Sequence, residues 1–122
     1  MKKKYSHKQS HMENKVIKLC DLPVNYNAVT ILEHNLKDRA DKDALFSVER
    51  GKMTFQQVSN EVNQLGNALK RLDVRRGDYV AILSLDCAEW AIAFFATIKI
   101  GAISIGMNTM SKPADLAYYF KD

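Results

Sequence analysis

The stretch IKIGAISIGMNT, residues 98–109, decides the fold class of this chain of 122 residues. Gly101 follows an apolar run and predicts the end of a helix in the left-handed conformation. Residues 102–106 predict a buried strand, and the polar pair Asn108 and Thr109 follows its carboxyl end. A helix that gives way at once to a buried strand is typical of an α/β fold.

The segment before this helix predicts a second buried strand. In DYVAILSL, residues 78–85, Val80 and Ile82 face one side while Ala81 and Leu83 face the other. Both faces are largely apolar, which predicts a strand covered on both sides, as in a parallel sheet.

The helix between the two strands, residues 88–100, is apolar around most of its circumference and therefore needs more than one neighbour. Asp86 is its expected cap. Aromatic side chains on this helix could suggest a platform for stacking bases, but the apolar context favours a core role for Trp90, Phe94 and Phe95.

A further helix begins at Thr54. Thr54 and Gln57 have the spacing of a capping box, in which each side chain satisfies the other residue's backbone N–H. Apolar residues recur at helical spacing and predict one buried face, formed by Val58, Val62, Leu65, Leu69 and Leu72. Gly66 and Ala68 are small enough to let another element approach.

The ends of the chain add three elements. A helix capped by Asn27 is expected through Arg39, and residues 44–48 and 53–55 predict a hairpin that turns at residues 49–52. A last helix is expected with Ser111 as its cap and Pro113 in its first turn. In the first of these helices the expected inward residues are Ile31, Leu32 and Leu36. In the last helix, Leu116, Tyr119 and Phe120 are expected to face inward at least in part. Strands that alternate with helices predict an α/β fold with a mostly parallel sheet.

Composition indicates one modest domain, because 47% of the residues are hydrophobic. The net charge of +4 arises largely in residues 1–20, a lysine-rich leader or tag that is expected to be disordered. Residues 21–122 are the expected domain. A basic leader can also bind nucleic acid or an acidic membrane surface, and this alternative is tested by deleting residues 1–18.

The remaining polar residues show no recognisable catalytic or metal-binding motif. Cys20 and Cys87 are far apart, which favours reduced thiols in a cytoplasmic protein. His7 and His11 share helical spacing but lack a third ligand, and His34 stands alone, so no metal site is predicted. No apolar run reaches the roughly 20 residues that a membrane span needs.

Parallel sheets place ligands at the carboxyl ends of strands, so we searched there. The five glycines are isolated, and no phosphate-binding glycine loop is present. Asp78 and Asp86 flank one strand and lie roughly 25 Å apart, too far for an acid–base pair. Asn108 and Thr109 are the positional candidates for a site, and the structural alternative is that Asn108 stabilises a turn.

Four segments together resemble the adenylate-forming acyl- and aryl-CoA synthetases. They are MTFQQV (53–58), VRRGDYVAI (74–82), IKIGAISIGMNT (98–109) and PADLAYYFKD (113–122). The run from Asn108 into ADLAYYFKD is most similar to the benzoate-type CoA ligases. Two departures are Asp73, where a glycine usually follows the helix, and Ser104, where a proline is common; Gly106 is expected to loosen the end of the second strand.

The resemblance implies part of an amino-terminal subdomain. Such enzymes use ATP and Mg²⁺ to convert a carboxylic acid to an acyl-adenylate, release pyrophosphate and pass the acyl group to coenzyme A. The matched residues are scaffold, so no catalytic, cofactor-binding or metal residue is carried over. The chain is therefore expected to be an inactive fragment whose partner is the remainder of a ligase, and truncation could be natural, a pseudogene product or an excision.

A different class of function stays open. The chain could be a free-standing α/β interaction or regulatory module that kept the fold without catalysis. That alternative predicts a monodisperse monomer that unfolds cooperatively. The helix that is apolar on all sides argues against it, because its outer faces would be uncovered.

Overall fold

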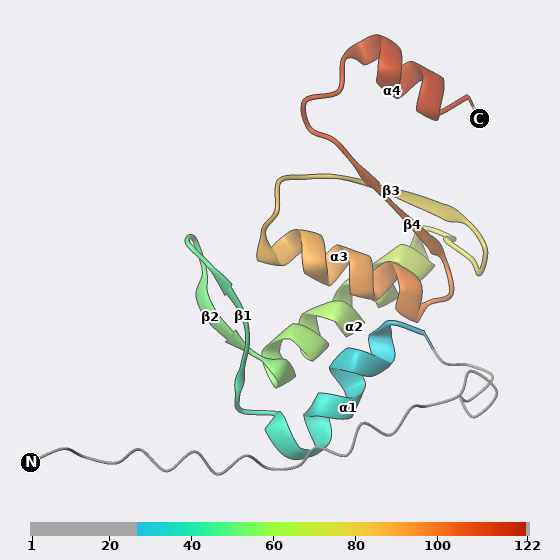
Figure 1. Ribbon diagram of the computed structural model, residues 1–122. Helices are drawn as coiled ribbons and strands as arrows, with labels where there is room; N and C mark the ends of the chain where they lie inside the picture. The colour runs from blue at the N-terminus through green and yellow to red at the C-terminus, as the bar shows by residue number, and fades with distance from the viewer. Residues whose placement is uncertain (1–26, 122) are drawn as a thin grey trace, which may run out of the picture.

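The computed structural model describes residues 27–121. The order of elements is helix, hairpin, helix, strand, helix, strand, helix, as the sequence predicts (Figure 1). The elements are α1 (Val29–Arg39), β1 (Asp43–Ser47), β2 (Gly51–Thr54), α2 (Phe55–Arg71), β3 (Tyr79–Leu83), α3 (Ala88–Lys99), β4 (Ile103–Met107) and α4 (Pro113–Tyr119). The predictions for the leader, His7, His11 and Cys20 lie outside the described residues.

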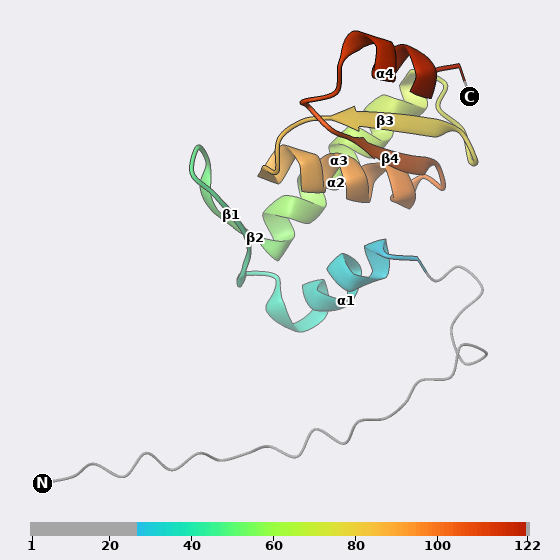
Figure 2. The same cartoon turned by 45° about the horizontal axis from the view of Figure 1, so that its top comes forward.

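Two small sheets are present. β1 and β2 form the predicted antiparallel hairpin, in which Gly51 takes a φ of +68°. β3 and β4 are parallel neighbours in a register from Tyr79 opposite Ile103 to Leu83 opposite Met107. Helix α3 is the crossover between them, so the α/β prediction is confirmed by a βαβ unit (Figure 2).

Helix α2 lies at the centre of the core, in contact with α1, α3 and the hairpin. Its capping box is present: Thr54 Oγ1 accepts from the Gln57 N–H at 3.2 Å, and Gln57 Oε1 accepts from the Thr54 N–H at 2.8 Å. Val58 and Val62 are almost fully buried, as predicted. A Cβ added to Gly66 would lie 3.3 Å from Ile100 Cγ2, which confirms that this glycine permits a close approach by α3.

The end of α2 explains why one residue of its predicted buried face is exposed. The helix ends at Arg71, and Asp73 takes the left-handed φ of +63° that the sequence departure implied. The Asp73 and Val74 N–H groups donate to the Lys70 and Leu69 carbonyls, which is a Schellman stop with aspartate in the glycine position. Leu72 therefore leaves the helical face and is 76% exposed.

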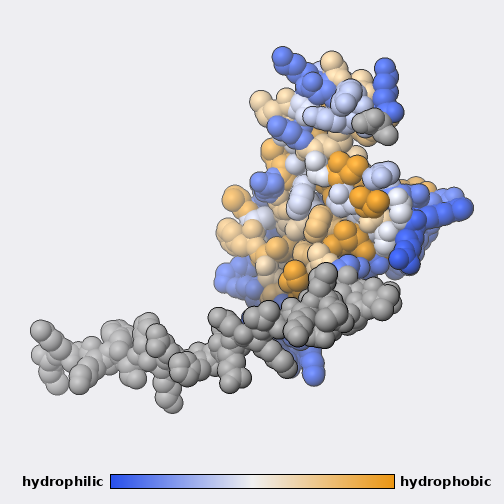
Figure 3. Space-filling model, turned by 45° about the vertical axis from the view of Figure 1, so that its right-hand side comes forward, coloured by the Kyte–Doolittle hydropathy of each residue, from blue (hydrophilic) through white to orange (hydrophobic). Residues whose placement is uncertain are grey.

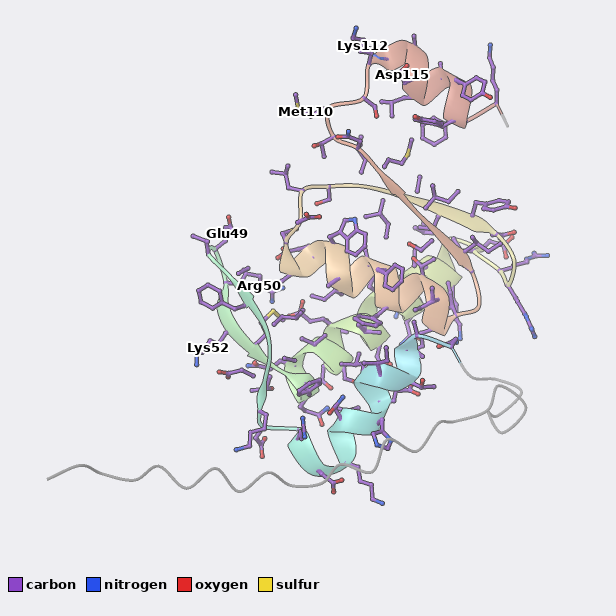
Figure 4. The ribbon with its side chains drawn as sticks, in the orientation of Figure 1. Glu49, Arg50, Lys52, Met110, Lys112 and Asp115 are labelled. Atoms are coloured by element: carbon purple, nitrogen blue, oxygen red, sulfur yellow. The ribbon has the colours of Figure 1, made fainter. Side chains whose placement is uncertain are left out.

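Three predicted caps and the predicted inward position of Ile31 are wrong. The N-cap of α1 is Ala28 instead of Asn27, although Asn27 Oδ1 accepts the Val29 N–H at 2.9 Å. The N-cap of α3 is Cys87 instead of Asp86, and that of α4 is Lys112 instead of Ser111. At α4 the Asp115 carboxylate accepts the Lys112 N–H at 3.0 Å, so an acid inside the first turn satisfies this donor (Figure 4). Helix α1 buries Val29 and Leu32, which turns Ile31 toward solvent.

The parallel sheet is covered on one face only. Helix α3 packs on the face that carries Ile82, whereas the opposite face exposes apolar residues that the sequence predicted to be covered. The exposed side chains of this outer sheet face are Tyr79, Leu83, Ile103 and Ile105. A groove of about 480 Å³ separates this face from Tyr119 and Phe120 of α4, which are more exposed than predicted (Figure 3).

Candidate functional site

The carboxyl ends of β3 and β4 meet at one edge of the parallel sheet, where the sequence placed its candidates. A hollow of about 380 Å³ lies there. Its lining residues are Ser84, Leu85, Asp86, Trp90, Gly106, Met107, Asn108 and Thr109. The structure thus brings Asn108 and Thr109 together with the polar residues that follow β3, and their role in binding stays a prediction.

Asn108 has a structural role in this hollow. Its Oδ1 accepts the Met110 N–H at 2.9 Å, and its carbonyl accepts the Ser111 N–H at 3.0 Å. This is the Asx turn that the sequence offered as the structural alternative. Asn108 and Thr109 are both exposed, so burial does not alter the polarity or hydrogen bonding of their side chains.

Trp90, for which the sequence predicted a core role, forms a wall of the hollow. Its ring is half-buried and stacks on Phe94 with centroids 5.5 Å apart and planes 6° apart. A Cβ on Gly106 would lie 3.4 Å from Trp90 Cζ2, so the glycine lets the indole rest against β4. The position of Trp90 one helical turn after Asp86 is the signal that could have placed it at this edge.

A larger groove lies on the other side of the loop between β3 and α3. This hairpin groove, of about 860 Å³, runs between residues 45–49 of the hairpin and residues 84–90. Its lining mixes apolar side chains with the acids Glu49, Asp86 and Glu89. Ser84 and Cys87 also line it, and their Oγ and Sγ atoms are 3.5 Å apart. Within the described part of the chain Cys87 is a free thiol, and because Cys20 lies outside that part, the reduced state of the pair stays a prediction.

One arginine joins the hairpin to both helices beside this groove. Arg50 points from the turn toward α2 and α3 (Figure 4). Its guanidinium makes a two-pronged pair with Glu61, with one Nη1–Oε2 distance of 2.8 Å, and a longer contact of 3.4 Å to Glu89. The hydrogen bond that Arg50 donates to Glu61 raises the pKa of Arg50 and lowers the pKa of Glu61. The pKa of Glu89 is lowered first by its own backbone N–H, and Arg50 adds to this.

The acids at the two ends of β3 lie apart from each other. Asp78 lies before β3 and accepts the Arg75 N–H at 2.7 Å, while Asp86 lies beyond the opposite end of that strand. Across residues 27–121 no three metal-ligating side chains converge. In the same range, no helix has the length and apolar character that crossing a membrane requires.

Comparison with known proteins identifies relatives by sequence. Residues 32–122 match the family described as AMP-binding enzyme. The chain is 33% identical over 92 residues to a putative acyl-CoA synthetase, YngI, of Bacillus subtilis, which covers 75% of this chain and 17% of that protein. It is 32% identical over 82 residues to the 3-hydroxybenzoate/4-hydroxybenzoate–CoA ligase of Thauera aromatica, covering 67% of this chain and 16% of the ligase.

Solved structures show the same arrangement. The anthranilate CoA ligase AuaEII, solved with anthranoyl-AMP, superposes with a TM-score of 0.81 and 56% identity over 85% of this chain and 20% of that one. A benzoate CoA ligase of Burkholderia xenovorans LB400 superposes with a TM-score of 0.73 and 24% identity over 79% of this chain and 19% of its own. The chain therefore spans about a fifth or less of the relatives that it matches.

Proposed function

Because this chain belongs to the AMP-binding enzyme family, with acyl- and aryl-CoA ligases among its relatives, we propose that it is an amino-terminal portion of an aryl-acid–CoA ligase. The reaction of the whole enzyme would join an aromatic acid to coenzyme A through an acyl-adenylate, with ATP converted to AMP and pyrophosphate. The observation that carries this proposal is the 56% identity to an anthranilate CoA ligase over 85% of the chain.

Residues 27–121 would serve this reaction as scaffold. The cofactors that the family implies are ATP, Mg²⁺ and coenzyme A, and the residues described here do not fit ATP or Mg²⁺. Their glycines are isolated instead of forming a phosphate loop, and they include no cluster of three metal-ligating side chains. We therefore assign no binding or chemical step to these side chains.

The outer sheet face supports a role within a larger protein. Tyr79 is 72% exposed and Leu83 is 53% exposed on a strand whose other face is packed. Apolar surface of this extent on two neighbouring strands usually marks a contact with another element. In this proposal the remainder of the ligase covers the outer sheet face. The same proposal includes a cytoplasmic location and a small carboxylic acid substrate.

A chimera tests this assignment. The segment of the anthranilate CoA ligase that matches residues 27–121 is replaced by this chain, and formation of the aryl-CoA is measured. We expect activity within about tenfold of the parent ligase, because the exchanged segment positions the sheet without touching substrate. The control chimera carries Val62→Asp at a fully buried position and should lose its fold and its activity.

The outcomes separate the two classes of function. A folded chimera without ligase activity would overturn the proposal in favour of an interaction module. The 122-residue polypeptide alone should catalyse no exchange between ATP and pyrophosphate, and measurable exchange would refute the scaffold assignment. A monodisperse monomer in light scattering would show that the outer sheet face needs no cover.

A further inference from the structure

The hairpin groove has two walls that are joined at one end by an ion pair. Glu49 belongs to the hairpin wall, and Arg50 follows it directly. Glu89, one of Arg50's two partners, belongs to the opposite wall on α3. We propose that Arg50 is a latch that holds the tip of the hairpin against α2 and α3 and thereby sets the width of this groove.

The geometry suits a latch. Arg50 binds Glu61 through both terminal nitrogens, and this two-pronged arrangement fixes the guanidinium more firmly than a single contact. One nitrogen, Nη1, also reaches Glu89. The side chain of Arg50 thus connects the hairpin turn to two helices, and it is only 35% exposed.

Among the described residues, no other ion pair connects the tip of the hairpin to a helix. Near the base, Met53 is buried and Leu45 packs against the core. Nearer the turn, Phe46 is 73% exposed and Val48 is 89% exposed. Across residues 27–121, the ion pairs that connect the hairpin to a helix all involve Arg50, since Lys52 pairs with Asp43 inside the hairpin. The base is therefore fixed by apolar packing, whereas at the tip the ion pairs of Arg50 act together with the burial of Ser47.

This division predicts that loss of Arg50 opens the groove without unfolding the core. Cys87 lines the groove and is half-buried, so its thiol reports how open the groove is. In a Cys20→Ser background Cys87 is the only thiol, because the chain contains two cysteines. The rate of alkylation by iodoacetamide, a neutral reagent, then measures access to Cys87.

We expect Arg50→Gln to raise the alkylation rate of Cys87 about threefold or more. Because iodoacetamide carries no charge, removing the charge of Arg50 does not change the local concentration of the reagent. An increase therefore reports opening. Arg50→Lys keeps the charge but lacks the two-pronged geometry and should give an intermediate rate.

The matched control is Lys52→Gln, which removes an ion pair from the same hairpin without freeing it from the helices. Its alkylation rate should equal that of the parent. An unchanged rate in Arg50→Gln, or an equal rise in both variants, would overturn the latch. If Arg50→Gln fails to fold, the parent protein still decides: sodium chloride should speed alkylation by screening the pairs, and a salt-independent rate refutes the proposal. None of these outcomes depends on ligase activity.

Discussion

Replacing Gly66 by leucine tests how closely α2 and α3 approach. A Cβ at this position would lie 3.3 Å from Ile100 Cγ2 and 3.7 Å from the Ala96 carbonyl oxygen. The first distance is already shorter than the roughly 3.5–4.0 Å of favourable carbon contacts. The further atoms of a leucine side chain would therefore have to displace Ile100 or push the helices apart.

The magnitude follows from two opposing effects. Replacing a glycine inside a helix adds about 1 kcal/mol of helix propensity. Overpacking a close interface costs about 1–3 kcal/mol. For Gly66→Ala a shift of Ile100 by a few tenths of an ångström suffices, so we expect a net stabilisation of about 0.5 kcal/mol. For Gly66→Leu the steric cost exceeds the gain, and we expect a net destabilisation of about 1–2 kcal/mol.

Urea unfolding followed by circular dichroism measures both variants in the 122-residue chain. Asn67→Leu is the matched control, because the neighbouring position on α2 is exposed and should change stability by less than about 0.5 kcal/mol. Adding Ile100→Ala to Gly66→Leu should recover part of the loss through a favourable coupling energy. A Gly66→Leu variant as stable as the parent would show that the helices do not approach as the structure describes.

Three further changes probe the ends and charges of α2. Thr54→Ala should cost about 1 kcal/mol, because the Gln57 N–H loses its acceptor, and urea unfolding measures the loss. Asp73→Gly should stabilise by about 0.5–1 kcal/mol at a φ of +63°, and an unchanged urea midpoint would contradict this. Glu61 has a lowered pKa through its bond to Arg50, so its stabilisation is present above its ordinary pKa of 4.5 and disappears as pH falls through the lowered value. The stability difference between the parent and Glu61→Gln should shrink over that acidic range.

Local signals in the sequence were sufficient for most of the fold. The box formed by Thr54 and Gln57, the stop at Gly101 and the two-sided apolar strands each act over a few residues. Helix and strand order, the hairpin and the parallel pair all follow from such signals. The left-handed Asp73, by contrast, was predicted from the family resemblance, in which a glycine usually follows this helix.

Features that depend on distant neighbours could not be predicted in this way. The direction in which α1 faces the core decides that Ile31 is exposed and Val29 buried, although both are apolar residues of the same helix. The pairing of Arg50 with Glu61 and Glu89 joins three elements across up to 39 positions, and nothing local marks it. In the candidate hollow, Asn108 and Thr109 were found because strand ends are predictable, whereas Trp90 required knowledge of how α3 packs on β4.

The one large disagreement between pattern and packing concerns the outer sheet face. Both sides of β3 and the outer side of β4 carry apolar residues, and α3 covers only the side of Ile82. In the proposed function, this face meets the remainder of the ligase, which would account for apolar residues that residues 27–121 leave uncovered. Ile103 and Ile105, on the uncovered side, are 44% and 42% exposed, which fits strands shaped to meet another layer. The apolar pattern of the strands therefore predicts which strand faces are covered better than it predicts the hollow at their carboxyl ends. The lining of that hollow includes exposed polar turns and the half-buried indole of Trp90.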